Sequence, residues 1–211
     1  KMAKLESTLK NMILSLFGVT FVASALLGYV HELTEAPIEQ AKKAREAKAV
    51  YQVVPVDSSL INSIEIEKET RYILKSTNEI LSKNDLQGKD PGQVDSLMIY
   101  HVSAQGKKFG TAVKSFTYNG FNGEIKLMAG FDSNGKLNNV KVLEHAETPG
   151  LGTKMTEKDF KKQFQGIDPA GFTFKVKKDG GDVDAITAAT ISTRAYCDAV
   201  KRAWEVYKSQ Q

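Results

Sequence analysis

A stretch of 19 residues without a charged side chain, from Met12 to Val30, constrains this chain more than any other feature of its sequence. As an α-helix with a rise of 1.5 Å per residue, the stretch would be about 28 Å long, which is close to the hydrocarbon thickness of a bilayer. The sequence therefore predicts a transmembrane helix over residues 12–30.

The charged residues before this stretch predict its orientation across the membrane. Lys1, Lys4 and Lys10 precede it, and an excess of basic residues marks the cytoplasmic end of a membrane span. We therefore expect segment 1–11 to lie in the cytoplasm and the chain after Val30 to lie on the other side of the membrane.

Two alternatives compete with an uncleaved anchor. A cleavable signal peptide could be cut at Ala23-Ser24-Ala25, but its apolar run would be longer than usual and the cut would expose Leu26, Leu27 and Tyr29. A buried core helix would be expected to show a polar face, and this stretch has none. The pattern favours the anchor over both alternatives.

Composition limits what the remaining chain can do. A single Cys excludes an intrachain disulfide framework and a Cys-rich zinc or iron–sulfur site, and 3 His leave little for a His-based metal site. The net charge of +4 on 211 residues gives no argument for nucleic-acid binding. Neither a metal site nor a catalytic triad is expected.

Residues 31–55 look like a helix that stays close to the membrane. Pro37 suits the first turn of a helix, and the Ala-, Lys- and Glu-rich run from Ile38 to Tyr51 predicts a helix that ends before Pro55. We interpret this segment as a membrane-proximal helix or linker. Residues 58–90 are polar and predict short elements of uncertain type.

From Leu97 onward, β-type runs alternate with turn signals such as Gln105-Gly106 and Asp132-Ser133-Asn134-Gly135. We expect strands over 97–102, 110–116, 124–131, 137–143 and 172–176. The predicted fold class is α+β, with a mostly antiparallel, twisted sheet flanked by helices in a domain of residues 56–211.

Two helices are expected in this domain. Thr156 and Asp159 resemble a capping box at the start of a helix over 156–164. Ala195, Ala199 and Ala203 recur every four residues, which predicts one apolar face on a long terminal helix over 193–209.

Two segments could hold a ligand. The first follows the fourth strand, where Pro149-Gly150 and Gly152 predict a tight turn with accessible backbone N–H groups. Glycine would let a flat ligand approach this backbone closely. The alternative is an ordinary connection between a strand and a helix.

The second segment, residues 184–193, precedes the terminal helix and contains four hydroxyl side chains, Thr187, Thr190, Ser192 and Thr193. The N-terminus of a helix carries partial positive charge and free N–H groups, which suit a phosphate. The alternative is simple capping of the helix by Thr193 or Ser192.

At these residues the chain resembles the FMN-binding domain family. Asp184-x-x-Thr187-Ala188-Ala189-Thr190 is similar to the flavinylation motif of that family, Asp-x-x-(Ser/Thr)-Gly-Ala-Thr, and Glu147-Thr148-Pro149-Gly150-Leu151-Gly152 is similar to its second signature. Both occur in the expected order behind one apolar helix. The family has Gly where this chain has Ala188, which puts the efficiency of flavinylation in question.

The resemblance implies that FMN is attached through its phosphate to Thr190, as a phosphoester made from FAD by a flavin transferase with a divalent metal. It also implies that residues of both segments, and of a hairpin before the third strand, contact the flavin. The candidate cofactor-binding residues are Asp184, Thr187, Ala188, Ala189, Thr190, Ser192, Thr193, Glu147, Thr148, Pro149, Gly150, Leu151, Gly152, Lys154, Tyr118 and Gly123.

Within the family, the chain is similar to G subunits of Rnf electron-transport complexes, which couple ferredoxin and NAD redox chemistry to ion transport. This implies an electron-carrying subunit, not a complete enzyme, in the bacterial inner membrane, with its flavin domain on the extracytoplasmic side. Its partners would be the other membrane, iron–sulfur and flavin subunits. The alternatives are the C subunit of a sodium-translocating NADH:quinone oxidoreductase and a non-redox anchored binding domain.

Overall fold

The computed structural model describes residues 8–56, 60, 63–74, 79–86 and 88–211. The chain divides into two compact units, residues 1–45 and 46–211, which are described separately. Of the segment expected in the cytoplasm, residues 1–7 lie outside the described part of the chain.

The N-terminal unit consists of one long helix. Helix α1 runs from Leu9 to Val53, and its last turns belong to the second unit. In the described part of the chain, α1 is the one helix long and apolar enough to cross a membrane. The apolar side chains of residues 12–30 are exposed, as a span in contact with lipid requires.

The prediction that a separate helix starts at Pro37 is wrong, because Pro37 lies inside α1. The residues that precede Pro37, from Glu32 to Ala36, are mostly good helix formers, so the helix does not stop before the proline. A proline inside a helix removes one backbone hydrogen bond. This helix continues on both sides of Pro37 despite that loss. The predicted end before Pro55 is confirmed.

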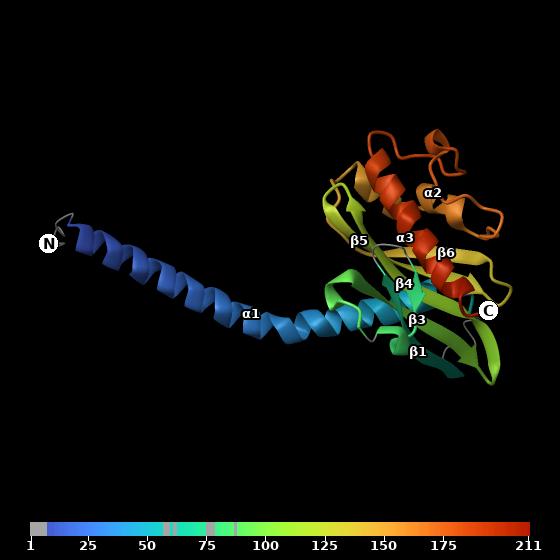
Figure 1. The fold of residues 1–211 in the computed structure, drawn as a ribbon, viewed down its shortest axis with the longest axis horizontal. Coiled ribbons are helices and arrows are strands. Elements are labelled where there is room, and N and C mark those ends of the chain that lie inside the picture. The colour runs from blue at the N-terminus through green and yellow to red at the C-terminus, as the bar shows by residue number, and fades with distance from the viewer. Residues whose placement is uncertain (1–7, 57–59, 61–62, 75–78, 87) are drawn as a thin grey trace. The chain divides into compact units, whose positions relative to one another are not determined.

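The second unit is built on a six-stranded sheet in which all neighbouring strands are antiparallel (Figure 1). The strand order is β2-β1-β3-β4-β5-β6. The strands are β1 (Ile64–Leu74), β2 (Ile80–Leu81), β3 (Val94–Ala104), β4 (Lys107–Gly120), β5 (Gly123–Asp132) and β6 (Leu137–His145). The α+β class and the four central strand predictions are confirmed.

Two strand predictions need correction. The polar segment after residue 58 contains the 11-residue strand β1, in which Ile64 and Ile66 alternate with charged residues. Residues 172–176 bury Phe174 and Val176 but form no strand. The backbone turns where the Lys175 N–H donates to the carbonyl of Thr173, and Val176 makes an isolated bridge to Val183. Apolar alternation there marks packing against the core without a sheet partner.

The helix expected over 156–164 is a succession of short turns. It comprises 3₁₀ helix η4 (Gly152–Thr156), helix α2 (Lys158–Lys161) and 3₁₀ helix η5 (Lys162–Phe164). The capping box is wrong, since the Thr156 hydroxyl donates to the carbonyl of Thr153 and the cap position of α2 is Glu157. Further 3₁₀ turns are η2 (Lys83–Leu86), η3 (Pro91–Gln93) and η6 (Lys177–Asp179).

Helix α3 (Thr190–Lys208) crosses one face of the sheet (Figure 1). Its buried face includes Ala195, Ala199 and Ala203, as the spacing predicts, and the helix begins three residues earlier than expected. The side chains of Ile125, Leu127, Ala129 and Phe131 on β5 face this helix in the main core. The main core therefore lies between α3 and the central strands.

The last turns of α1 cover the opposite face of the sheet. Ala49, Val50 and Val53 are buried against alternate residues of the same strands, such as Met128 of β5. Glu46 pairs with Lys114 of β4 and accepts a hydrogen bond from the hydroxyl of Tyr100. The helix end is so close to the sheet that a Cβ at Gly130 would lie 2.3 Å from the Val53 carbonyl oxygen.

We expect Gly130→Ala to lower the free energy of unfolding by about 1–3 kcal/mol, because the added methyl group would push the end of α1 away from β5. Urea unfolding of the chain in detergent measures the loss. Gly171→Ala is the matched control, since no atom lies within 4 Å of a Cβ at that position. Equal stability of the two variants would show that α1 does not pack on this face.

Candidate functional site

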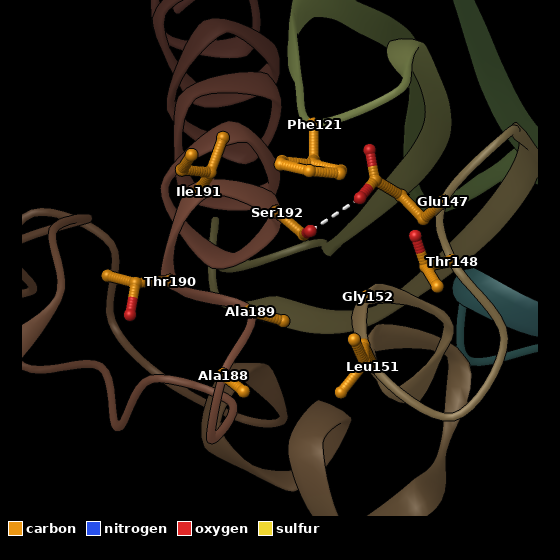
Figure 2. A pocket seen from close by; sticks show the side chains of 10 residues that line it. All are labelled: Phe121, Glu147, Thr148, Leu151, Gly152, Ala188, Ala189, Thr190, Ile191 and Ser192. Atoms are coloured by element: carbon orange, nitrogen blue, oxygen red, sulfur yellow. Dashed lines mark hydrogen bonds between the residues drawn. The ribbon is translucent and has the colours of Figure 1, made fainter.

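A cavity of about 340 Å³ lies where three segments that are distant in the sequence meet (Figure 2). The segments are the turn between β4 and β5, the segment after β6, and the start of α3. The cavity is lined by Phe121, Glu147, Thr148, Leu151, Gly152, Ala188, Ala189, Thr190, Ile191 and Ser192.

One wall is the turn after β6. Gly150 has a φ of +75°, in the region that favours glycine, and its N–H donates to the Thr153 hydroxyl at 2.9 Å. The N–H of Leu151 donates to the carbonyl of Thr148 at 3.2 Å. The tight turn predicted from Pro149-Gly150 is present, and it presents the partly exposed Leu151 side chain to the cavity.

The opposite wall is the first turn of α3. Ala189 occupies the cap position without a capping side chain, and the first turn contains no acidic residue. The first backbone N–H groups of a helix have no partner within it. This end of α3 therefore offers hydrogen-bond donors and partial positive charge beside the cavity.

Capping of α3 by Thr193 or Ser192, the alternative from the sequence, is wrong. The helix starts at Thr190, so both side chains lie inside its first turn. The Thr193 hydroxyl accepts from the N–H of Ile186 and donates to the carbonyl of Ala189, which fixes the loop before the helix. The Ser192 hydroxyl instead donates to the carboxylate of Glu147, in the segment after β6.

The buried carboxylate of Glu147 joins the three segments. It accepts a hydrogen bond from the Ser192 hydroxyl at 2.5 Å and another from the backbone N–H of Asn122 at 3.2 Å. Figure 2 shows the Ser192 contact across the cavity. A Cβ at Gly152 would lie 2.6 Å from both the Glu147 carboxylate and the Ser192 hydroxyl, so only glycine allows this close packing.

Ala188 has a φ of +61°, in the left-handed region that side chains with a Cβ disfavour. This is the position at which the family motif has Gly. The backbone of the chain thus keeps the conformation that suits Gly and tolerates one methyl group there.

Asp184 lies outside the cavity lining, and its hydrogen bonds and ion pair hold the loop that precedes α3. The backbone N–H of Asp184 donates to the side-chain oxygen of Gln163 at 2.6 Å, and the side-chain amide of Gln163 donates to the Asp184 carbonyl. The carboxylate of Asp184 pairs with Lys177 at 2.8 Å. Nearby, the Arg194 guanidinium donates two hydrogen bonds to Asp179 and lowers the pKa of that carboxyl. These contacts fix the loop on which Thr187 to Thr190 lie.

The structure brings half of the candidate residues together and leaves the others outside. Those in the cavity lining are Glu147, Thr148, Leu151, Gly152, Ala188, Ala189, Thr190 and Ser192. Those outside it are Asp184, Thr187, Thr193, Pro149, Gly150, Lys154, Tyr118 and Gly123.

Sequence reasoning missed Phe121 and Ile191, which both line the cavity. Each is a large apolar residue beside a flagged position, Phe121 between Tyr118 and Gly123 and Ile191 next to Thr190. Both side chains are exposed in the fold, and the sequence alone does not reveal exposure.

Other reactive groups lie elsewhere. Burial raises the pKa of the Cys197 thiol to about 12, and the nearby Asp198 charge adds to the effect. The thiol is therefore an inert part of the core. Among the residues that the structure describes, no group of three or more His, Cys, Asp or Glu side chains could hold a metal ion.

Comparison with known proteins agrees with this geometry. The FMN-binding domain family matches residues 120–205, which include every residue of the cavity lining. The G subunit of the ion-translocating oxidoreductase complex of Shewanella piezotolerans is 31% identical over 205 residues, covering 94% of this chain and 88% of the relative. The corresponding protein of Aliivibrio fischeri is 32% identical over 208 residues, covering 95% and 90%.

Among solved structures, NqrC of Shewanella oneidensis has a TM-score of 0.49 at 20% identity, over 77% of this chain and 91% of that one.

The fold and the cavity thus define an FMN-binding domain behind a candidate membrane-spanning helix. The chain belongs to the family of the G subunits of ion-translocating oxidoreductase complexes.

The cavity fits the cofactor that the family binds. Leu151, Ile191 and Phe121 offer apolar surface to a flat ring, and the hydroxyl of Thr190 lies at the uncapped start of α3, where a phosphate is favoured. In Figure 2, Thr190 is at one edge of the cavity and Thr148 is at the other. The residues present can therefore hold both the ring and the phosphate of FMN.

We expect Ser192→Ala to lower the free energy of unfolding by about 1.5–3 kcal/mol, because the buried Glu147 carboxylate would lose its hydroxyl donor. Thermal unfolding followed by circular dichroism measures the loss. Thr190→Ala is the control, since no described residue binds the Thr190 hydroxyl, and it should change the stability little. A loss as large in Thr190→Ala would contradict this account.

We expect Ala188→Gly to raise the free energy of unfolding by about 0.5–1 kcal/mol, because relief of the left-handed strain exceeds the added flexibility of the unfolded chain. Calorimetry should show a rise in the midpoint of about 2 °C. Ala189→Gly, at a φ of −137°, should show no rise. A fall in the midpoint of Ala188→Gly would refute the argument from strain.

Proposed function

We propose that this chain is an electron-carrying subunit of an Rnf-type ion-translocating complex and works through FMN bonded to Thr190. The family and its FMN-binding domain support the class of function. The position of Thr190 supports the attachment point: its side chain lines the cavity at the first residue of α3, whereas Thr187 of the same motif does not line it.

The attachment is a phosphoryl transfer with a definite balance. The Thr190 hydroxyl oxygen attacks the FMN phosphorus of FAD, the phosphoanhydride bond breaks and AMP leaves with its phosphate. The hydroxyl proton passes to a base of the flavin transferase or to water. The new bond is a phosphoester between Thr190 and FMN, and no electron is exchanged.

This chain's own residues would then hold the cofactor. The first N–H groups of α3, which have no partner within the helix, would stabilise the remaining negative charge of the phosphodiester. The turn from Thr148 to Gly152 forms the opposite wall, and its backbone would lie close to the bound cofactor. When bound, FMN accepts and donates electrons singly or in pairs, which suits a relay between partners.

The apolar part of α1 supports attachment of this relay to a membrane. Lys1, Lys4 and Lys10 before the span support a cytoplasmic N-terminus, so the flavin domain would lie outside the bacterial inner membrane. Its partners would be the other membrane, iron–sulfur and flavin subunits of the complex, with ferredoxin and NAD as distant redox partners. The covalent bond would prevent loss of the cofactor on that side.

We expect the protein co-expressed with a flavin transferase to gain the mass of one FMN less water and to fluoresce on a denaturing gel. Thr190→Ala should give a dark band and the mass of the bare polypeptide, because the acceptor oxygen is missing. Thr187→Ala removes an exposed hydroxyl of the same motif outside the cavity lining, and its band should stay bright.

A dark wild-type band with an unmodified mass would contradict the proposed function. A bright band for Thr190→Ala together with a dark band for Thr187→Ala would show that FMN is bonded to Thr187 instead.

A further inference from the structure

The half-buried lysines of residues 46–211 differ in how their charges are compensated. In the described part of this unit they are Lys114, Lys126, Lys141 and Lys161. Lys114 pairs with Glu46, and Lys126 pairs with Glu124 at 2.9 Å. A lysine ammonium that leaves water loses hydration, and a nearby carboxylate offsets that loss.

Lys141 and Lys161 have no such compensation. Neither forms an ion pair with a carboxylate of the described residues, and the acidic residue inside α2, Asp159, pairs with Lys162 at 2.8 Å. Burial lowers the pKa of the Lys161 ammonium, and the positive charges of Lys141 and Lys158 lower it further. These three lysines, named the basic cluster, therefore repel one another at one place on the surface.

The fold enforces this arrangement. Strand β6 is at the edge of the sheet, and the chain after η5 returns to it. The N–H of Leu137 donates to the carbonyl of Ile167 at 3.0 Å, and the side chain of Gln165 donates to the side chain of Asn139 at 3.1 Å. These bonds hold the segment of α2 and η5 beside β6, so the lysine of the strand lies near the two lysines of the helix.

Both segments that carry the basic cluster lead directly into the cavity wall. Strand β6 ends two residues before Glu147, and η4, which precedes α2, begins at Gly152; both residues line the cavity. Phe160 of α2 packs edge-on against Tyr196 of α3, with the ring centroids 5.1 Å apart, so α2 lies beside the helix that starts at Thr190 (Figure 1). A protein that covered the basic cluster would therefore lie next to the cavity.

We propose that the basic cluster is a docking surface for a protein that presents carboxylates and exchanges electrons with the bound FMN, which rests on the proposed function. Carboxylates of a partner would offset the repulsion among the three ammonium groups. Complementary charges steer and orient association, and electron-transfer partners bind through small interfaces. The position beside the cavity favours a redox protein over an anionic lipid surface, because electron transfer requires close approach to the flavin.

The first test measures docking without the cofactor. The full-length protein, made without a flavin transferase, is placed in phosphatidylcholine nanodiscs, and a fluorescent polyglutamate peptide is added at low salt. Fluorescence anisotropy should show binding that added salt weakens. The cluster variant, Lys141→Gln, Lys158→Gln and Lys161→Gln together, should bind the peptide about tenfold more weakly.

The matched control variant combines Lys83→Gln, Lys108→Gln and Lys208→Gln, which removes the same charge from exposed lysines of η2, β4 and α3. It should bind the peptide as the wild type does. The cluster variant should unfold at the same temperature as the wild type or a higher one, because it loses the repulsion. A lower midpoint would overturn the argument from uncompensated charge.

The second test measures electron transfer in the flavinylated full-length protein. The flavin is photoreduced and then reoxidised by the anion ferricyanide. Two ferricyanide ions each take one electron from the fully reduced flavin, their Fe(III) becomes Fe(II), and the flavin protons pass to water. The cluster variant should react with ferricyanide several-fold more slowly than the control variant, and no more slowly with the cation hexaammineruthenium(III).

Equal peptide affinity of the cluster and control variants would overturn the docking surface, whether or not the protein carries FMN. A larger loss of affinity for phosphatidylglycerol vesicles than for the peptide would overturn it in favour of a lipid contact. Equal ferricyanide rates of the two variants would overturn the exchange of electrons at this surface. Wild-type protein that lacks FMN by intact mass would overturn the proposed function instead, and the peptide result would still decide whether the cluster docks carboxylates.

Discussion

The packing of α3 on the central strands is the interaction on which the site depends. Ala195, Ala199 and Ala203 give the helix a face of small side chains, which lets it lie close to β4 and β5 in the main core. This packing fixes the N-terminal end of α3 beside the segment after β6. Thr190, the first residue of the helix, therefore lies in the wall of a cavity and not on an open loop.

Glu147 converts this packing into a defined pocket. A buried carboxylate is stabilised only when its oxygens are hydrogen-bonded, and its two donors, Ser192 and Asn122, come from two further segments. Because Gly152 has no Cβ, the turn can approach both oxygen-bearing side chains. The rigid part of the site is therefore polar and buried, whereas the surface offered to a ligand by Phe121 is apolar and exposed.

The sheet is covered on both faces, and the two covers have different roles. Helix α3 carries the candidate attachment residue, and the last turns of α1 cover the other face through Val50 and Val53. The helix that carries the apolar span is thus also part of the core of the second unit.

Local patterns of apolar spacing and turn residues were enough to predict the charge-free span, the central hairpins and the alanine face of α3. Motifs in the chain also pointed to Thr190 and to the turn at Gly152. The same patterns could not reveal strand β1, whose charged alternation reads as polar, or the continuity of α1 through Pro37, because neighbouring turns control whether a proline ends a helix. The contact between Glu147 and Ser192 and the exposure of Phe121 emerge only in the folded molecule, because they depend on how segments far apart in the chain pack against one another.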